Sequence, residues 1–143
     1  MEKLKVLFVC VHNSARSQMA EKFLNSIGGE NFSAESAGLE PGRLNPFVVK
    51  SMLEIGFDIS GNRTKDVFEF YKSGKKYDYV ITVCDEASGQ RCPIFPGALK
   101  TIHWSFEDPS SFAGTEEEII IKIANVRDAI KSKVTEFIKT LNS

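Results

Sequence analysis

The sequence predicts an α/β fold in which helices cover both faces of a parallel β-sheet. Short, β-branched apolar segments alternate along the chain with segments whose apolar residues recur every three or four positions. Two of the short segments, 4–10 and 77–83, are apolar along most of their length, as are strands that are buried on both faces. A chain of 143 residues has the length of one domain with one substantial core, so we expect a single domain over residues 1–143.

The segment 4–10 is predicted to be a strand that leads through a loop into a helix over 16–27. The apolar run of this segment covers only residues 6–11 before His12 interrupts it, which is too short for a signal peptide or a membrane span. The helix is predicted from apolar residues at three-and-four spacing, and the pair Gly28-Gly29 is expected to end it.

A second strand and two further helices are expected next. Residues 32–36 have the composition of a strand, and a turn is predicted to begin at Ala37-Gly38. Asn45 is a good N-cap for a second helix, which has proline at its first position and ends at Gly56. Thr64 is expected to cap a short third helix.

The last third of the chain contains two strands and a long helix. Residues 77–83 are predicted to form a central parallel strand that is followed by Cys84, and residues 100–104 a final strand. Thr115 and Glu118 form a capping box for the C-terminal helix. The buried positions of that helix are expected to be Ile119, Ile123, Val126, Ile130, Val134, Phe137, Ile138 and Leu141.

Composition and charge exclude several classes of function. The chain is 42% hydrophobic and 26% charged, which is typical neither of disorder nor of a coiled coil. A net charge of -1 argues against a nucleic-acid binder with a broad basic surface. Three cysteines without an export signal are more typical of reactive thiols in a reducing compartment than of a disulfide framework. We therefore expect a cytoplasmic monomer that binds neither nucleic acid nor a membrane.

The loop after Cys10 contains the first candidate site. Backbone N–H groups that converge at a helix start can surround a tetrahedral oxyanion, and the same positive field favours a thiolate at Cys10. Arg16 adds a planar two-pronged donor, Ser17 can donate a hydrogen bond to the sulfur, and Asn13 tolerates a left-handed backbone. The alternative is a packed strand-end thiol beside a surface arginine, but the combination of a strand, Cys-x5-Arg-Ser and a helix favours the anion-binding loop. The predicted oxyanion-binding loop consists of Val11, His12, Asn13, Ser14, Ala15 and Arg16.

Two further candidates follow other predicted strands. Cys84 comes directly after the strand 77–83, and Asp108 comes shortly after the last strand. Ligands of open parallel sheets bind beyond the carboxyl ends of the strands. We therefore expect Cys10, Cys84 and Asp108 to lie in one crevice.

With these residues, the chain resembles the low-molecular-weight protein tyrosine phosphatase-like superfamily and, within it, the thioredoxin-coupled arsenate reductases. The resemblance covers essentially the whole chain. It implies a three-layer sandwich of the low-molecular-weight phosphatase type, with four parallel strands in the order 2-1-3-4 and helices on both faces. The motifs that carry it are Val9-Cys10, Arg16-Ser17-Gln18-Met19-Ala20-Glu21, Ser36-Ala37-Gly38, Val83-Cys84, Cys92-Pro93, His103-Trp104 and Asp108-Pro109.

The resemblance also implies a reaction, the reduction of arsenate to arsenite in arsenic detoxification. Cys10 would attack arsenate in the loop, while Arg16 holds its oxygens and Asp108 protonates the departing oxygen. Cys84 would then attack Cys10 and release arsenite, leaving a Cys10–Cys84 disulfide. Cys92 would attack Cys84, and thioredoxin would reduce the resulting Cys84–Cys92 disulfide. The implied catalytic residues are Cys10, Arg16, Ser17, Cys84, Cys92 and Asp108.

No tightly bound cofactor is implied, but some members of the family hold a monovalent cation, typically potassium, beside the loop. Oxygen ligands suit such an ion. If no ion binds there, the two acidic side chains among the matching residues would be ordinary solvated charges. The matching positions are Asn13, Glu21, Ser36 and Asp66.

Three alternatives stay open. A phosphotyrosine phosphatase, which hydrolyses phosphomonoesters, would need Cys10 but neither Cys84 nor Cys92. In such phosphatases tyrosines usually line the slot for the aryl group, whereas this chain has Ser110 and Ser111 there. Because the loop chemistry is shared, we expect weak phosphatase activity beside the reductase. The second alternative is that the later two cysteines are inert core residues. The third is a zinc- or anion-binding regulatory module, although the chain has no Cys-x2-Cys pair.

Overall fold

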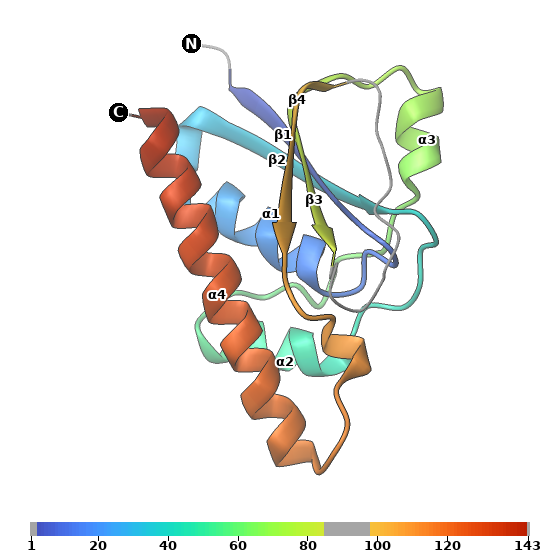
Figure 1. Ribbon diagram of the computed structural model, residues 1–143, viewed down its shortest axis with the longest axis vertical. Helices are drawn as coiled ribbons and strands as arrows, with labels where there is room; N and C mark the ends of the chain where they lie inside the picture. The colour runs from blue at the N-terminus through green and yellow to red at the C-terminus, as the bar shows by residue number, and fades with distance from the viewer. Residues whose placement is uncertain (1–2, 85–97, 143) are drawn as a thin grey trace.

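Four parallel strands form one sheet in the computed structural model, which describes residues 3–84 and 98–142 (Figure 1). The strands are β1 (Leu4–Cys10), β2 (Phe32–Gly38), β3 (Tyr77–Cys84) and β4 (Ala98–Ser105). They lie in the order β2-β1-β3-β4, so β1 and β3 are central. Every neighbouring pair is parallel. The predicted sheet and its strand order are confirmed.

Helices lie on both faces of this sheet (Figure 1). The side chains of β1 alternate between two clusters: Val6 and Phe8 belong to the larger cluster, and Leu7 and Val9 belong to the smaller one, which includes Val67 of α3. Because every one of these strand residues is fully buried, β1 is covered on both sides. The helices are α1 (Arg16–Ile27), α2 (Pro46–Glu54), α3 (Val67–Lys72) and α4 (Glu116–Asn142), with short 3-10 helices at Gly29–Asn31 and Pro109–Ser111.

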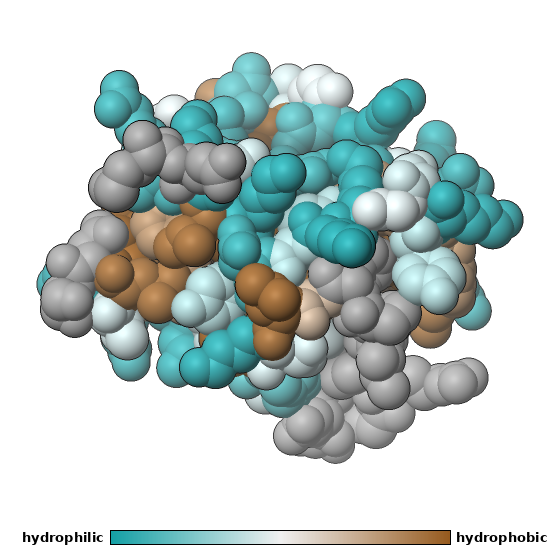
Figure 2. Space-filling view, turned by 90° about the horizontal axis from the view of Figure 1, so that it is seen from above, coloured by the Kyte–Doolittle hydropathy of each residue, from teal (hydrophilic) through white to brown (hydrophobic). Residues whose placement is uncertain are grey.

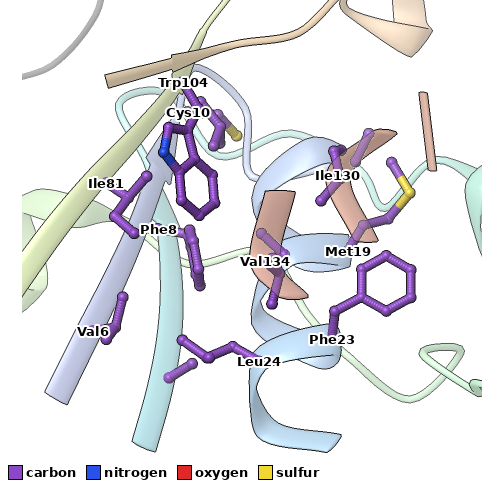
Figure 3. Close-up of a cluster of buried hydrophobic side chains, with 14 of the residues drawn as sticks. Val6, Phe8, Cys10, Met19, Phe23, Leu24, Ile81, Trp104, Ile130 and Val134 are labelled. Atoms are coloured by element: carbon purple, nitrogen blue, oxygen red, sulfur yellow. The ribbon is translucent and has the colours of Figure 1, made fainter. Parts of the chain in front are cut away.

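The larger core cluster lies between β1, α1 and α4. In Figure 3, Val6, Phe8 and Cys10 follow one another along β1, and Trp104 of β4 lies beside the last two. The rings of Phe8 and Trp104 are 5.8 Å apart. Met19, Phe23, Ile130 and Val134 close the cluster from the helix side. The sulfur of Cys10 therefore lies at the end of a row of packed apolar side chains.

Two element boundaries differ from the sequence prediction. The second strand does not turn at Ala37 but continues to Gly38, because β1 offers partners as far as Cys10. The short third helix is capped by Asp66, whose carboxylate accepts the N–H of Phe68, and not by Thr64. The hydroxyl of Thr64 donates instead to the carbonyl of Gly42. The first difference arises from pairing with another strand, and the second from the local bond between Asp66 and Phe68.

The C-terminal helix follows the prediction closely. Thr115 Oγ1 accepts the N–H of Glu118 and lies 3.1 Å from its carboxylate, which is the expected capping interaction. Six of the eight predicted core positions are buried, and Ile119 and Leu141 are partly buried against the same cluster. Within the described residues, no helix is both long and apolar enough to span a membrane. Seen from the end where the N-terminus lies, the surface is largely hydrophilic, with hydrophobic residues in small separate areas (Figure 2).

Candidate active site

The loop between β1 and α1 turns its carbonyl groups away from its concave side. Four of these carbonyls accept backbone N–H groups from the segment 39–45, and the carbonyl of Asn13 accepts the side-chain amide of Gln18. A trans peptide directs its N–H opposite to its C=O, so the following N–H groups point into the loop. Such a row of N–H groups is an anion-binding nest. The four bonds are Leu39 N to Cys10 O (3.1 Å), Glu40 N to Val11 O (2.7 Å), Gly42 N to His12 O (3.0 Å) and Asn45 N to Ser14 O (2.9 Å).

The sulfur of Cys10 receives two hydrogen bonds from this loop. It lies 3.1 Å from the N–H of Asn13 and 2.8 Å from the hydroxyl of Ser17. Ser17 Oγ already accepts the side-chain amide of Asn13 at 2.7 Å, so its single proton is directed to the sulfur. Cys10 is only 2% exposed. A buried sulfur with two hydrogen-bond donors beside it is arranged as an acceptor.

Arg16 and Asp108 meet beside the loop although they are 92 positions apart in the chain. One amino group of the Arg16 guanidinium lies 3.5 Å from a carboxylate oxygen of Asp108, and the other donates to the carbonyl of Phe106 at 3.1 Å. The second carboxylate oxygen of Asp108 accepts the N–H of Ser110. The side chains of Arg16 and Asp108 are 3% and 13% exposed. The guanidinium is therefore fixed at the first residue of α1, next to the nest.

The structure brings the backbone of Cys84 to the same edge of the sheet. Cys84 is the last residue of β3, and the preceding Thr82 pairs with Val9 of β1. The side chain of Cys84 and the whole of Cys92 lie outside the described residues. The predicted disulfides Cys10–Cys84 and Cys84–Cys92 therefore stay predictions.

Gln18 supports the loop and was not identified from the sequence as a functional residue. This fully buried side chain donates from Nε2 toward the carbonyl and the side-chain oxygen of Asn13 and toward the carbonyl of Arg63, at 3.0–3.1 Å. Its oxygen accepts the side-chain amide of Asn62. Asn13 itself has a φ of 53°, in the left-handed region. No local signal marks Gln18, because a glutamine on a helix is usually exposed.

The four residues predicted to bind a cation lie on one side of the loop, but their oxygens already have protein partners. Glu21 Oε1 accepts the hydroxyl of Ser36 at 2.9 Å and lies 3.1 Å from the ammonium of Lys65. The side-chain oxygen of Asn13 accepts two N–H groups, and that of Asp66 caps α3. The residues therefore do not fit a bound ion as predicted, because a lysine ammonium already lies against the partly buried carboxylate of Glu21. Among the described residues, no group of three or more Cys, His, Asp and Glu could hold a metal ion.

Comparisons with known proteins agree with this geometry. A family model described as low molecular weight phosphotyrosine protein phosphatase matches residues 5–143. The arsenate reductase of Bacillus subtilis is 41% identical over 140 residues, which cover 98% of this chain and 99% of that protein. The solved structure of an arsenate reductase in its phosphate-binding state superposes with a TM-score of 0.79 at 33% identity, covering 96% of this chain and 98% of the other. A thioredoxin-dependent arsenate reductase of Corynebacterium glutamicum superposes with a TM-score of 0.60 at 29% identity, covering 93% of this chain and 62% of that one.

Proposed function

The chain belongs to the low molecular weight phosphotyrosine protein phosphatase family, and from this premise we propose that it reduces arsenate to arsenite with Cys10 as the nucleophile. The observation that carries the proposal is the buried Cys10 sulfur, which accepts the Asn13 N–H in a loop whose carbonyl groups are bonded to the segment 39–45 and to Gln18. A row of backbone N–H groups beside an arginine suits the negative charge of a tetrahedral oxyanion such as arsenate. The similarity to named arsenate reductases over the full length selects arsenate among such anions.

The residues around Cys10 account for the first step. The sulfur attacks arsenic, and Arg16 holds two oxygens of the bound anion with its planar guanidinium. Asp108, which lies 3.5 Å from Arg16, is placed to protonate the oxygen that leaves as water. Ser17 holds the sulfur by its hydroxyl proton. A covalent Cys10–arsenic adduct results, with arsenic still pentavalent.

The remaining cysteines supply the electrons in our proposal. Cys84 attacks the Cys10 sulfur, which transfers two electrons to arsenic, releases arsenite and leaves a Cys10–Cys84 disulfide. Cys92 then attacks Cys84, and the Cys84–Cys92 disulfide is reduced by thioredoxin. Two facts support this relay: Cys84 ends the strand next to β1, and one structural relative is a thioredoxin-dependent arsenate reductase.

Phosphatase activity is the second candidate, because the nucleophile and its loop serve both reactions. The family model carries the name of a phosphotyrosine phosphatase. A hollow of about 330 Å³ beside the loop is lined by Phe47, Pro109 and Phe112 among others, with Ser110 in its wall. Ser110 and Ser111 lack aromatic rings at the positions where such phosphatases usually have tyrosines, although Phe47 and Phe112 line other parts of the hollow. We therefore propose that phosphomonoester hydrolysis is a weak side activity.

The test couples the purified protein to thioredoxin, thioredoxin reductase and NADPH, and follows NADPH consumption with and without arsenate. We expect consumption that requires arsenate and is abolished in Cys10→Ser. Cys92→Ser should complete one turnover and then stop, because the disulfide cannot move outward. Full multiple-turnover activity of Cys92→Ser with thioredoxin would contradict the relay. Turnover of para-nitrophenyl phosphate far above that of arsenate would instead favour the phosphatase.

A further inference from the structure

Lys65 connects the oxyanion-binding loop to the partly buried carboxylate of Glu21. Its backbone N–H donates to the side-chain oxygen of Asn13 at 2.9 Å, and its carbonyl accepts the N–H of Gly38 at 2.8 Å. Its ammonium extends to Glu21 on α1, at 3.1 Å. One residue therefore contacts the loop through its backbone and the helix that follows the loop through its side chain.

The pair formed by Lys65 and Glu21 is more enclosed than an ordinary surface ion pair. The side chains are 24% and 15% exposed, and Glu21 also accepts the hydroxyl of the fully buried Ser36. In contrast, Lys75 and Glu35 form a pair of the same 3.1 Å length whose side chains are 42% and 38% exposed. Removing one partner of an enclosed pair leaves a charge without compensation, whereas an exposed pair contributes little.

We propose that the Lys65 ammonium serves as the built-in cation of the oxyanion-binding loop and makes this protein independent of added potassium. The carboxylate of Glu21 needs one positive partner, and Lys65 supplies it at the position where the family resemblance implied an ion. The oxygen of Asn13 that would have bound the ion instead accepts the Lys65 N–H and the amide of Gln18. Lys65 is thus a positioning residue: it acts on the anion through Asn13 and does not contact it.

The consequence for the loop follows from the left-handed backbone of Asn13. This conformation directs the Asn13 N–H to the Cys10 sulfur, and the side-chain bonds of Asn13 hold it there. If the ammonium is removed, Glu21 repels the anion in the loop and Lys65 loses its side-chain anchor, so the N–H groups lose their common direction. Binding of an oxyanion should weaken unless another cation takes the vacated place.

The experiment measures phosphate binding by isothermal titration calorimetry in choline chloride and in potassium chloride at equal ionic strength. The experiment rests on the oxyanion-binding part of the proposed function. It needs no arsenate turnover, so a failure of the reductase proposal would appear in the NADPH assay and not in the phosphate titration. For the wild type, we expect the same phosphate affinity in both salts, within about twofold. Lys65→Ala should bind about tenfold more weakly in choline, as expected when one partner of an enclosed ion pair is lost. Potassium should restore most of that loss, because the shortened side chain leaves room for the ion.

Two matched variants complete the test. Lys65→Met fills the same space without charge, so potassium should not restore its affinity. Lys75→Met removes a lysine from the exposed pair with Glu35 and should bind phosphate like the wild type in both salts. If Lys65→Ala does not fold, Lys65→Met and the wild type still give the comparison, with the melting temperature in each salt as a second readout.

Three results would overturn the proposal. The first is a wild type whose phosphate affinity rises severalfold with potassium, because an ion would then bind beside Lys65. The second is Lys65→Ala with wild-type affinity in choline, because the ammonium would then not support the loop. The third is Lys65→Ala weakened equally in both salts, because no ion would then be able to replace the ammonium.

Discussion

Replacing Asn13 should destabilise the protein by a large amount that can be calculated from its contacts. The fully buried side chain makes three hydrogen bonds, to Ser17 at 2.7 Å, to Lys65 N–H at 2.9 Å and to Gln18 at 3.0 Å. A net loss of about 1 kcal/mol per bond gives about 3 kcal/mol. Alanine in the left-handed region adds about 1 kcal/mol of strain. Asn13→Ala should therefore lower the free energy of unfolding by about 4 kcal/mol.

Asn13→Gly separates the strain from the lost hydrogen bonds. Glycine adopts a φ of 53° without strain. It also raises the conformational entropy of the unfolded chain, which lowers the free energy of unfolding by about 0.5 kcal/mol. Asn13→Gly should therefore be more stable than Asn13→Ala by about 0.5 kcal/mol. At positions with a negative φ the order is usually the reverse, and the alanine variant is more stable than the glycine variant. Both variants should also bind phosphate at least about tenfold more weakly, because the loop amides lose their support.

Urea unfolding measures the free energies of unfolding, provided that their dependence on urea concentration has the same slope in all variants. Phosphate titration measures the anion affinity of the loop. Two results would refute the reasoning: both variants lying within about 0.5 kcal/mol of the wild type, which is the range of ordinary surface changes, or Asn13→Ala being the more stable of the two. The first would mean that the hydrogen bonds contribute nothing net. The second would mean that the loop is not held in the left-handed conformation.

Three further predictions concern other parts of the fold. Arg127, buried in α4, donates to the carbonyl and hydroxyl of Ser51 in α2, so Arg127→Met should lower the free energy of unfolding by about 2 kcal/mol in urea. Burial and the neighbouring Glu35 raise the pKa of Tyr77, so its phenol ionises at lower pH in the unfolded chain than in the folded protein. The free energy of unfolding should therefore fall above about pH 10, by up to about 1.4 kcal/mol per pH unit. Tyr77→Phe should show a smaller fall across the same pH series. A Cβ at Gly38 would lie 2.8 Å from backbone atoms of the loop, so Gly38→Ala should both destabilise the fold, by about 1–3 kcal/mol, and weaken phosphate binding; wild-type affinity would contradict the close approach.

Much of the fold could be predicted because its signals are local. The apolar run of β1, the spacing of α1 and the capping residues of α2 and α4 each act within a few positions of the chain. The same holds for the first part of the site, since the strand end, the five-residue loop and the helix start are contiguous around Cys10. Ser17 lies only seven positions from Cys10, and the structure places its hydroxyl at the sulfur.

Other features could not be predicted because they depend on contacts between distant segments. The extension of β2 to Gly38 depends on pairing with β1, and the hydroxyl of Thr64 donates to the distant carbonyl of Gly42 while Asp66 caps α3. From the sequence alone Gln18 would be expected on the surface, because its contact with the carbonyl of Arg63 forms only in the folded chain. The strand pairing of Gly38 and the contact between Gln18 and Arg63 join residues that lie too far apart along the chain for periodicity or spacing to indicate them.

The sequence by itself determined the alternation of strands and helices, the nucleophile at the end of the first strand and the donors that follow it, because local propensity and contiguous spacing specify these features. Only the tertiary structure decided what balances the charge of Glu21. From the sequence, Glu21 was expected to bind an external ion together with other oxygen ligands. In the folded chain the ammonium of Lys65, 44 positions away, lies 3.1 Å from the Glu21 carboxylate. A partly buried carboxylate is stabilised by a positive partner, and which partner it finds depends on the path of the whole chain.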